Sequence, residues 1–336
     1  MTSSTLPRPV TPTAPRIGRW SLGPLLARGS ISDVFPATHD NGSEVALKVL
    51  RRELADDEKL VRRFHRSAEL VNRVQHAGVV KAIDDGVTPW GAPFLVLERV
   101  RGESAQDRAD RLGGTLSDAE TVEIATRLLA VLDAVHRAGV VHRNVKPTNV
   151  WIEPDGHVRL LGFGTAFAPD GELWSDLTMP GMVVGTVGFM APEQARGRRD
   201  EVNHTADLWG VGATMTTLLT GRLVHPRSST YEQLRAASAQ PAMPLARSAP
   251  HIPAALAEVI DTALGFSSSW RWDAAEDMRR ALLDAGVHGP TSEPYARDDE
   301  EEPPQTVRRP MALEPSPPRA TGWLPIIVAA GTRHGS

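Results

Sequence analysis

The 336-residue sequence contains no cysteine, carries no strong charge and lacks a long hydrophobic run. The absence of cysteine excludes disulfides, thiolate metal sites and a cysteine nucleophile, and it agrees with the cytoplasmic location that we expect. A formal net charge of −4 gives no basic surface for nucleic acid, so we expect no such partner. The eleven histidines show no HExxH spacing, which gives no indication of a zinc site.

The two ends of the chain differ in composition from the middle. Residues 1–16 contain four prolines and no apolar run, which predicts a disordered segment rather than a signal peptide or a membrane span. Residues 287–336 are Pro-rich and acidic and predict a disordered tail. The late apolar stretch Trp323–Gly331 contains Pro325 and is too short for the roughly 20 residues of a membrane span. We therefore expect no transmembrane segment; an anchor or docking peptide is the alternative to a frayed tail.

The middle of the chain, residues 17–286, changes from a strand pattern to a helical one. Short alternating apolar runs over 20–50, with Asn41-Gly42 as a hairpin turn, predict a β-meander. Apolar residues at helical spacing predict a helix over 54–74, and strands follow at 79–83 and 94–100. Ser117 and Glu120 form a capping box before a long helix that Gly139 ends. Further helices are predicted at 206–219, closed by Gly221, and at 254–264 and 274–285.

Five short segments occur in an order that is typical of one enzyme family. They are LLARGSISDVF (25–35), VALKV (45–49), HRNVKPTN (142–149), LGFG (161–164) and APE (191–193). Together they resemble the protein-kinase signature, and GTVGFMAPEQARG (185–197) is most similar to bacterial Ser/Thr protein kinases. The resemblance covers about residues 17–286. It implies a bilobal α+β fold, with a small five-stranded sheet lobe at 17–100 and a mostly helical lobe at 101–286.

The resemblance also implies a nucleotide pocket, since kinases act by positioning phosphates and neutralising their charge. The implied nucleotide-binding positions are Gly29, Val34, Ala46, Lys48, Glu98, Val100 and Trp151. Lys48 would contact the α- and β-phosphates, and Glu98 and Val100 would present a backbone carbonyl and N–H to adenine. Trp151 would lie beneath the adenine, where the family has Leu or Met.

Each acidic position of the family pattern has changed. Asn144 replaces the aspartate that accepts the substrate proton, and Gly162 replaces the aspartate that binds the metal. Ser67 stands where the family has the glutamate that pairs with Lys48. Glu69 lies two residues away, on a different face of the predicted helix, and cannot substitute for it. We therefore expect no metal site.

Apart from Asn144, the catalytic loop and the structural positions of the family pattern are retained. Asn144, Lys146 and Asn149 occupy the catalytic positions, although without an acid at 162 we expect Asn149 only to order its loop. In the Gly-rich segment, Ala27 and Ser32 replace two glycines. The retained structural positions are His142, Glu193, Asp207 and Arg271. The resemblance implies a buried Glu193–Arg271 ion pair and implies that Asp207 supports the backbone of the HRN loop.

Two threonines belong to the predicted activation segment. Thr178 is a candidate for regulatory phosphorylation, although a solvated or packed threonine is the default. For Thr186 we expect a structural role.

These changes predict a catalytically inactive pseudokinase. A general base contributes about 10²–10⁴-fold to rate, and a metal adds several kcal/mol of charge stabilisation. We expect a regulator or scaffold of bacterial Ser/Thr kinase signalling that binds another protein, such as an active kinase or its substrate. ATP binding is expected to be weak or absent, without Mg²⁺. Two alternatives remain open, namely a weak, atypical ATP-dependent Ser/Thr kinase and a nucleotide sensor that does not turn ATP over.

Overall fold

The computed structural model describes residues 15–168 and 185–286. The predictions for residues 1–14, for Thr178 and for the tail 287–336 lie outside these ranges. Strand β1 (Arg16–Ile17) begins inside the segment that was predicted to be disordered. Arg16 belongs to the sheet because it is paired with Ser21 of the next strand.

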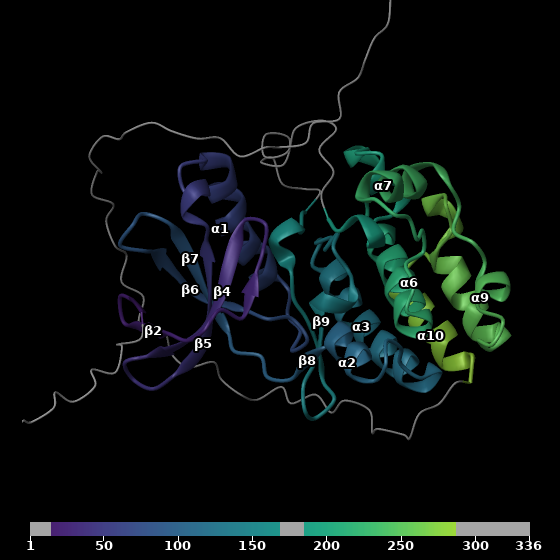
Figure 1. The fold of residues 1–336 in the computed structure, drawn as a ribbon, viewed down its shortest axis with the longest axis horizontal. Coiled ribbons are helices and arrows are strands. Elements are labelled where there is room, and N and C mark those ends of the chain that lie inside the picture. Colours follow the sequence, from purple (N-terminus) through teal and green to yellow (C-terminus); the bar gives the residue numbers. More distant parts are fainter. Residues whose placement is uncertain (1–14, 169–184, 287–336) are drawn as a thin grey trace, which may run out of the picture. The chain divides into compact units, whose positions relative to one another are not determined.

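Seven strands form an antiparallel sheet in the first part of the chain (Figure 1). They are β1, β2 (Trp20–Leu22), β3 (Ala27–Arg28), β4 (Ser32–His39), β5 (Glu44–Leu50), β6 (Ala82–Val87) and β7 (Pro93–Glu98). The expected number of five was wrong by two. Strand β1 adds one strand before Trp20, and β2 and β3 pair with successive parts of β4 but are separated around Pro24, which lacks a backbone donor. The Asn41-Gly42 turn is confirmed between β4 and β5, with Gly42 at φ +89°.

One long helix, α1 (Glu58–Arg73), packs on this sheet (Figure 1). It begins later than predicted because the Asp57 side chain accepts hydrogen bonds from the N–H groups of Lys59 and Leu60 and caps the helix. Phe64 of α1 lies in a cluster with Leu50 and Leu95 of the sheet. The predicted strand at 79–83 is instead β6, which starts at residue 82.

The second part of the chain is mostly helical (Figure 1). Its helices are α2 (Ala105–Arg111), α3 (Asp118–Arg137), α5 (Pro192–Ala195), α6 (Thr205–Thr220), α7 (Thr230–Ala239), α8 (Leu245–Ser248), α9 (Ala254–Ala263) and α10 (Ala275–Asp284). A small sheet contains β8 (Glu103–Ser104), β9 (Val150–Ile152) and β10 (Val158–Leu160). The bilobal α+β fold is thus confirmed, with α2, α5, α7 and α8 added to the helices that the sequence predicted.

The predicted helix ends are mostly correct. Gly139 and Gly221 follow α3 and α6 in the left-handed region, at φ +69° and +66°, where glycine avoids the steric cost of a Cβ. The capping box is only half formed. Ser117 accepts a hydrogen bond from the Glu120 N–H at 3.2 Å, but the Glu120 carboxylate pairs with Arg108 of α2.

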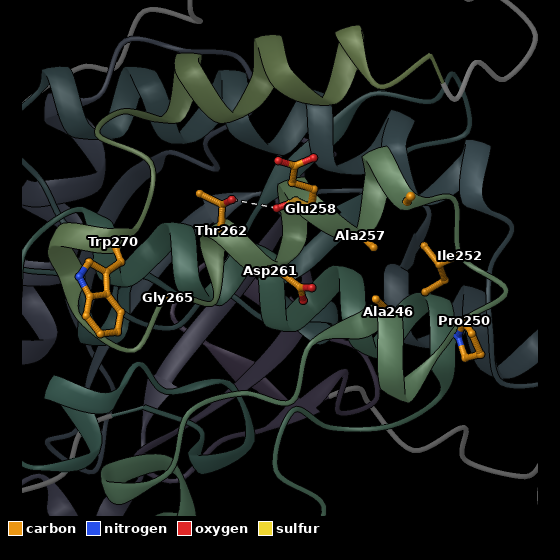
Figure 2. A pocket seen from close by; sticks show the side chains of 10 residues that line it. Ala246, Pro250, Ile252, Ala257, Glu258, Asp261, Thr262, Gly265 and Trp270 are labelled. Carbon is orange, nitrogen blue, oxygen red and sulfur yellow. Dashed lines mark hydrogen bonds between the residues drawn. The ribbon is translucent and has the colours of Figure 1, made fainter.

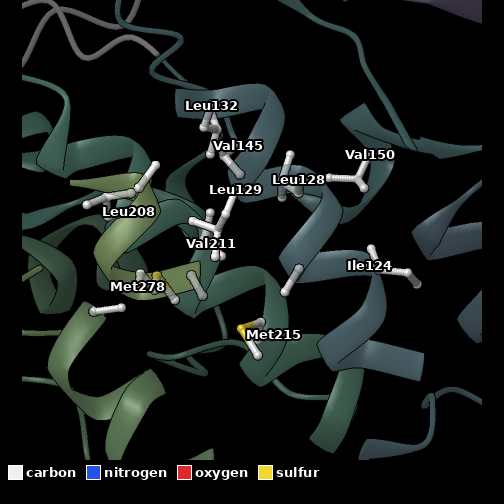
Figure 3. Close-up of a cluster of buried hydrophobic side chains, with 14 of the residues drawn as sticks. Ile124, Leu128, Leu129, Leu132, Val145, Val150, Leu208, Val211, Met215 and Met278 are labelled. Atoms are coloured by element: carbon white, nitrogen blue, oxygen red, sulfur yellow. The ribbon is translucent and has the colours of Figure 1, made fainter. Parts of the chain in front are cut away.

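The core of the helical part lies between α3, α6 and α10 (Figure 3). Leu128 and Leu132 of α3 and Leu208 of α6 are fully buried there. Val145 and Val150 also belong to this core, and they flank the segment 146–149. The core therefore anchors the loop that carries Lys146 and Asn149. No helix in the described ranges is long and apolar enough to cross a membrane.

Candidate functional site

The loop 142–149 connects α3 to β9 and is held from beneath by Asp207 of α6. The Asp207 carboxylate accepts hydrogen bonds from the backbone N–H groups of His142 at 2.9 Å and Arg143 at 2.7 Å. Burial by itself raises the pKa of Asp207, but hydrogen bonds led by His136 bring it below its ordinary value. A buried, ionised Asp207 thus holds Arg143 at φ +64°, in agreement with the support that the resemblance implied.

Asn144 lies at the position of the proton acceptor, within a chain of three side chains. Lys146 Nζ donates to Thr186 Oγ1 at 2.8 Å, and that hydroxyl donates to Asn144 Oδ1 at 3.2 Å. The amide oxygen of Asn144 is therefore occupied as an acceptor, and an amide does not take up a proton at neutral pH. Thr186 connects the residues on either side of Val145, which is the structural role that we expected.

Gly162 has no side chain to bind a metal, and the side chain of Asn149 occupies the space beside it. A Cβ added at residue 162 would lie 2.5 Å from Asn149 Nδ2 and 2.7 Å from Asn149 Cγ. Asn149 is fixed in this position because Nδ2 donates to the Asn144 carbonyl at 2.8 Å. The residues present do not fit a magnesium ion, which requires oxygen ligands, usually with at least one carboxylate.

Lys48 of β5 projects toward the same region without an acidic partner. Among the described residues, no carboxylate lies within 4.0 Å of its ammonium group. Ser67, at the family's glutamate position, is buried and donates to the Phe64 carbonyl of its own helix at 2.7 Å. Glu69 pairs with Arg66 instead. The Ser67 hydroxyl is thus satisfied within α1, and in the described part of the chain no hydrogen bond joins it to Lys48.

A second cation approaches Lys48 from α1. Arg63, one helical turn before Ser67, donates from Nε to the Gly164 carbonyl at 3.1 Å, and a Cβ at Gly164 would lie 3.5 Å from Lys48 Nζ. Burial and the positive charge of Arg63 lower the pKa of Lys48 to about 8. This part of the site is electropositive where the active family has an ion pair. Helical spacing from Ser67 could have identified Arg63, which was not among the predicted site residues.

The Gly-rich segment is closed into a tight hairpin between β3 and β4. The Gly29 N–H donates to the Ser32 carbonyl at 2.8 Å, and a Cβ at Gly29 would meet the same oxygen at 2.7 Å. Ser32 is buried, and Ile31 at the tip packs against Phe64 and its cluster. The Gly29 N–H is therefore engaged within the hairpin and is not presented to a phosphate.

The residues predicted to surround adenine lie on β4, β5, β7 and β9 and in the segment after β7. Val34 and Ala46 are half-buried on β4 and β5, and among the described residues the Val100 N–H donates no backbone hydrogen bond. The indole N–H of Trp151 donates to the Arg101 carbonyl at 3.1 Å. Trp151 therefore lies against the segment that follows Val100.

The Glu98 side chain connects the two parts of the chain. It forms an ion pair with Arg159 of β10 at 2.5 Å, and it accepts a hydrogen bond from the Lys81 N–H at 3.1 Å. Arg159 was missed in the sequence because its partner is 61 residues away.

The remaining predicted residues stabilise the helical part. Arg271 and Glu193 form a buried, bidentate ion pair at 2.7 and 2.8 Å. His142 is buried, and its ring lies 2.9 Å from the Leu161 carbonyl and packs edge-on against Phe163. Burial lowers the pKa of His142. These contacts stabilise the part of the chain that carries the loop 142–149.

Comparison with known proteins gives one consistent family. The family model described as "Protein kinase domain" matches residues 20–281. A probable serine/threonine-protein kinase of Streptomyces coelicolor is 32% identical over 287 residues, which are 82% of this chain and 41% of the relative. The serine/threonine-protein kinase PknB of Mycobacterium tuberculosis is 31% identical over 293 residues, 84% of this chain and 45% of the relative. The chain thus spans less than half the length of these relatives.

Proposed function

This chain belongs to the protein kinase family, and we propose that it is a catalytically inactive member that regulates or scaffolds bacterial Ser/Thr kinase signalling by binding another protein. The observation that carries this proposal is the arrangement at Gly162, where the Asn149 amide fills the space of the missing metal ligand. The substitution has been accommodated by the surrounding residues, so the site is adapted to the absence of the acid. We place this activity in the cytoplasm.

The other two changed positions support the same proposal. Asn144 is held by Thr186 as a hydrogen-bond acceptor, and Ser67 is satisfied within α1. Loss of a general base costs about 10²–10⁴-fold, and loss of the metal removes a second large contribution. In contrast, the Glu193–Arg271 pair and the Asp207 hydrogen bonds are retained. The chain has kept what maintains its shape and has lost what performs the chemistry.

A phosphotransfer assay with ATP and a generic basic substrate tests the proposal. The wild-type chain is expected to transfer no more phosphate than Lys48→Met. A Gly162→Asp variant is expected to remain inactive as well, because the restored carboxylate must displace Asn149 and because Asn144 still cannot accept a proton. Transfer by the wild type that Lys48→Met abolishes would establish the weak, atypical kinase in place of the inactive protein.

A nucleotide sensor is the second candidate, and the electropositive pair Lys48 and Arg63 favours it. Two cations without a carboxylate can bind phosphate oxygens directly, without a metal. The engaged Gly29 N–H argues for weak binding. Thermal melting with 1 mM ATP, with and without Mg²⁺, separates the candidates: a sensor gains stability from ATP, and little of that gain depends on metal.

A further inference from the structure

A groove lies on the helical part, away from the catalytic loop, between α8, α9 and the segment before α10 (Figure 2). Its volume is about 590 Å³, which falls within the range of about 300–1,000 Å³ that is usual for ligand sites. Its lining residues are Ala246, Pro250, Ile252, Ala254, Ala257, Glu258, Asp261, Thr262, Gly265 and Trp270. The lining is thus mostly apolar with a few polar groups, as in protein binding sites generally.

Two carboxylates of the groove have no cationic partner. Among the described residues, neither Glu258 nor Asp261 forms an ion pair, and the nearby Arg247 of α8 forms none with them. Within residues 15–168 and 185–286, Asp261 accepts hydrogen bonds only from the Leu245 N–H, at 3.0 and 3.1 Å. Burial raises the pKa of Asp261, because the charged form is poorly solvated there. A cation placed beside Asp261 would supply the missing partner.

An exposed aromatic ring stands at one end of the groove. Trp270 is 68% exposed, and Figure 2 shows it at the opposite end from Pro250 and Ile252, with Asp261 between them. An exposed indole offers a large apolar face on which an apolar side chain of a bound segment can pack. An apolar end, a central carboxylate and an exposed indole therefore complement a basic residue with apolar neighbours.

The walls of the groove are fixed by hydrogen bonds. The Asp261–Leu245 hydrogen bonds join α9 to α8. Arg271, held by its ion pair with Glu193, donates from Nε to the Gly265 carbonyl at 2.8 Å, and Gly265 lines the groove. A preformed groove avoids part of the ordering cost of binding. The buried ion pair that the catalytic site does not require thus helps to maintain this surface.

We propose that this groove binds a short segment of a partner protein in which an arginine or lysine lies between apolar residues. The basic side chain pairs with Asp261, and its apolar neighbours contact Pro250 at one end of the groove and Trp270 at the other. The inference rests on the proposed function, since it supplies the surface through which an inactive kinase-like protein engages its partner. An acidic segment is disfavoured by the two unpaired carboxylates.

Three synthetic hexapeptide pools test the proposal with the full chain. One position is fixed as Arg, as citrulline, which is its neutral isostere, or as Glu, and the other five positions are randomised. Each pool carries a fluorophore, and binding is measured by anisotropy. The Arg pool is expected to bind about tenfold more tightly than the citrulline pool, because a charge-assisted hydrogen bond is lost in the latter. The Glu pool is expected not to bind.

Matched variants locate the binding. Asp261→Asn retains an acceptor for the Leu245 N–H but removes the charge, and Trp270→Ala removes the exposed ring. Asp261→Asn is expected to reduce the preference for the Arg pool about tenfold or to abolish it, and Trp270→Ala is expected to weaken the binding of the Arg pool. Asp84→Asn and Trp90→Ala change an acid and a tryptophan that are exposed on the other part of the chain, and both should bind the Arg pool as the wild type does.

The outcomes separate the groove from the proposed function. No binding of any pool, equal binding of the Arg and citrulline pools, or unchanged binding by both groove variants would overturn the docking site. Phosphotransfer is measured on the same samples. Transfer that Lys48→Met abolishes would overturn the proposed inactivity, while a preference for the Arg pool that depends on Asp261 would still establish the groove.

Discussion

Replacement of Arg271 by alanine is expected to destabilise the helical part strongly. The guanidinium group makes two hydrogen bonds to the Glu193 carboxylate and three to the backbone carbonyls of Thr205, Gly265 and Phe266. The Arg271 side chain is fully buried, and the Glu193 side chain is only 5% exposed. Arg271→Ala therefore leaves a carboxylate in the interior without a counter-charge and three carbonyls without these donors.

The size of the effect follows from this geometry. Removal of one partner from a buried ion pair costs about 3–5 kcal/mol. For a domain of this size, each kcal/mol lowers the melting temperature by roughly 2–4 °C, so a fall of roughly 6–20 °C is expected. Glu193→Gln added to Arg271→Ala should recover about 1–3 kcal/mol, because the uncompensated charge is then removed. This partial recovery distinguishes a buried charge from a simple loss of contacts.

Calorimetric or far-ultraviolet circular dichroism melting at pH 7 measures both effects. Arg280→Ala serves as the matched control. Arg280 also forms ion pairs, with Glu276 and Asp277, but its side chain is 64% exposed. Its loss should change stability by no more than about 1 kcal/mol. A fall of less than 2 °C for Arg271→Ala, or an additional loss when Glu193→Gln is combined with it, would refute the reasoning.

Three further outcomes are expected. Lys48→Met should raise the melting temperature at pH 7 on the order of several degrees, since the Lys48 pKa falls from 10.5 to about 8 on folding and a shift of one unit corresponds to about 1.4 kcal/mol. In the wild type, the free energy of unfolding should rise as the pH increases from about 8 to 10.5. Over this range Lys48 is still protonated in the unfolded chain but has lost its proton in the folded chain. Melting curves over this range should show no such rise in Lys48→Met, and an equal rise would exclude Lys48 as its source. Trp151→Leu should strengthen ATP binding in a thermal-shift titration by removing the indole beside the Arg101 carbonyl; unchanged or weaker binding would show that Trp151 does not restrict the site.

The sequence by itself determined the family, the change from a strand-rich to a helical part and the positions at which the chain departs from the family pattern. These features are local, since a hairpin turn at Asn41-Gly42, a helix ended by Gly221 or a motif such as VALKV depends on residues that are neighbours in the chain. The same locality explains the misplaced helix start, where the side chain of Asp57 competes with the apolar spacing that begins at Leu54. The strand count was wrong by two, because Pro24 interrupts a pattern that otherwise remains continuous and because the pairing of β1 with β2 lies at the edge of a segment whose composition indicates disorder.

Tertiary structure alone decided which groups surround the changed positions. The Asn149 amide fills the space beside Gly162, and Arg63 reaches the Gly164 carbonyl from 101 residues away. Neither contact follows from residue type, because each depends on how separate segments are brought together by the core. The α8–α9 groove also depends on tertiary contacts, since part-buried hydrogen bonds from Leu245 to Asp261 and from Arg271 to Gly265 hold its walls. The sequence shows where residues of the family pattern have changed, and the packing of distant segments determines which side chains lie at those positions.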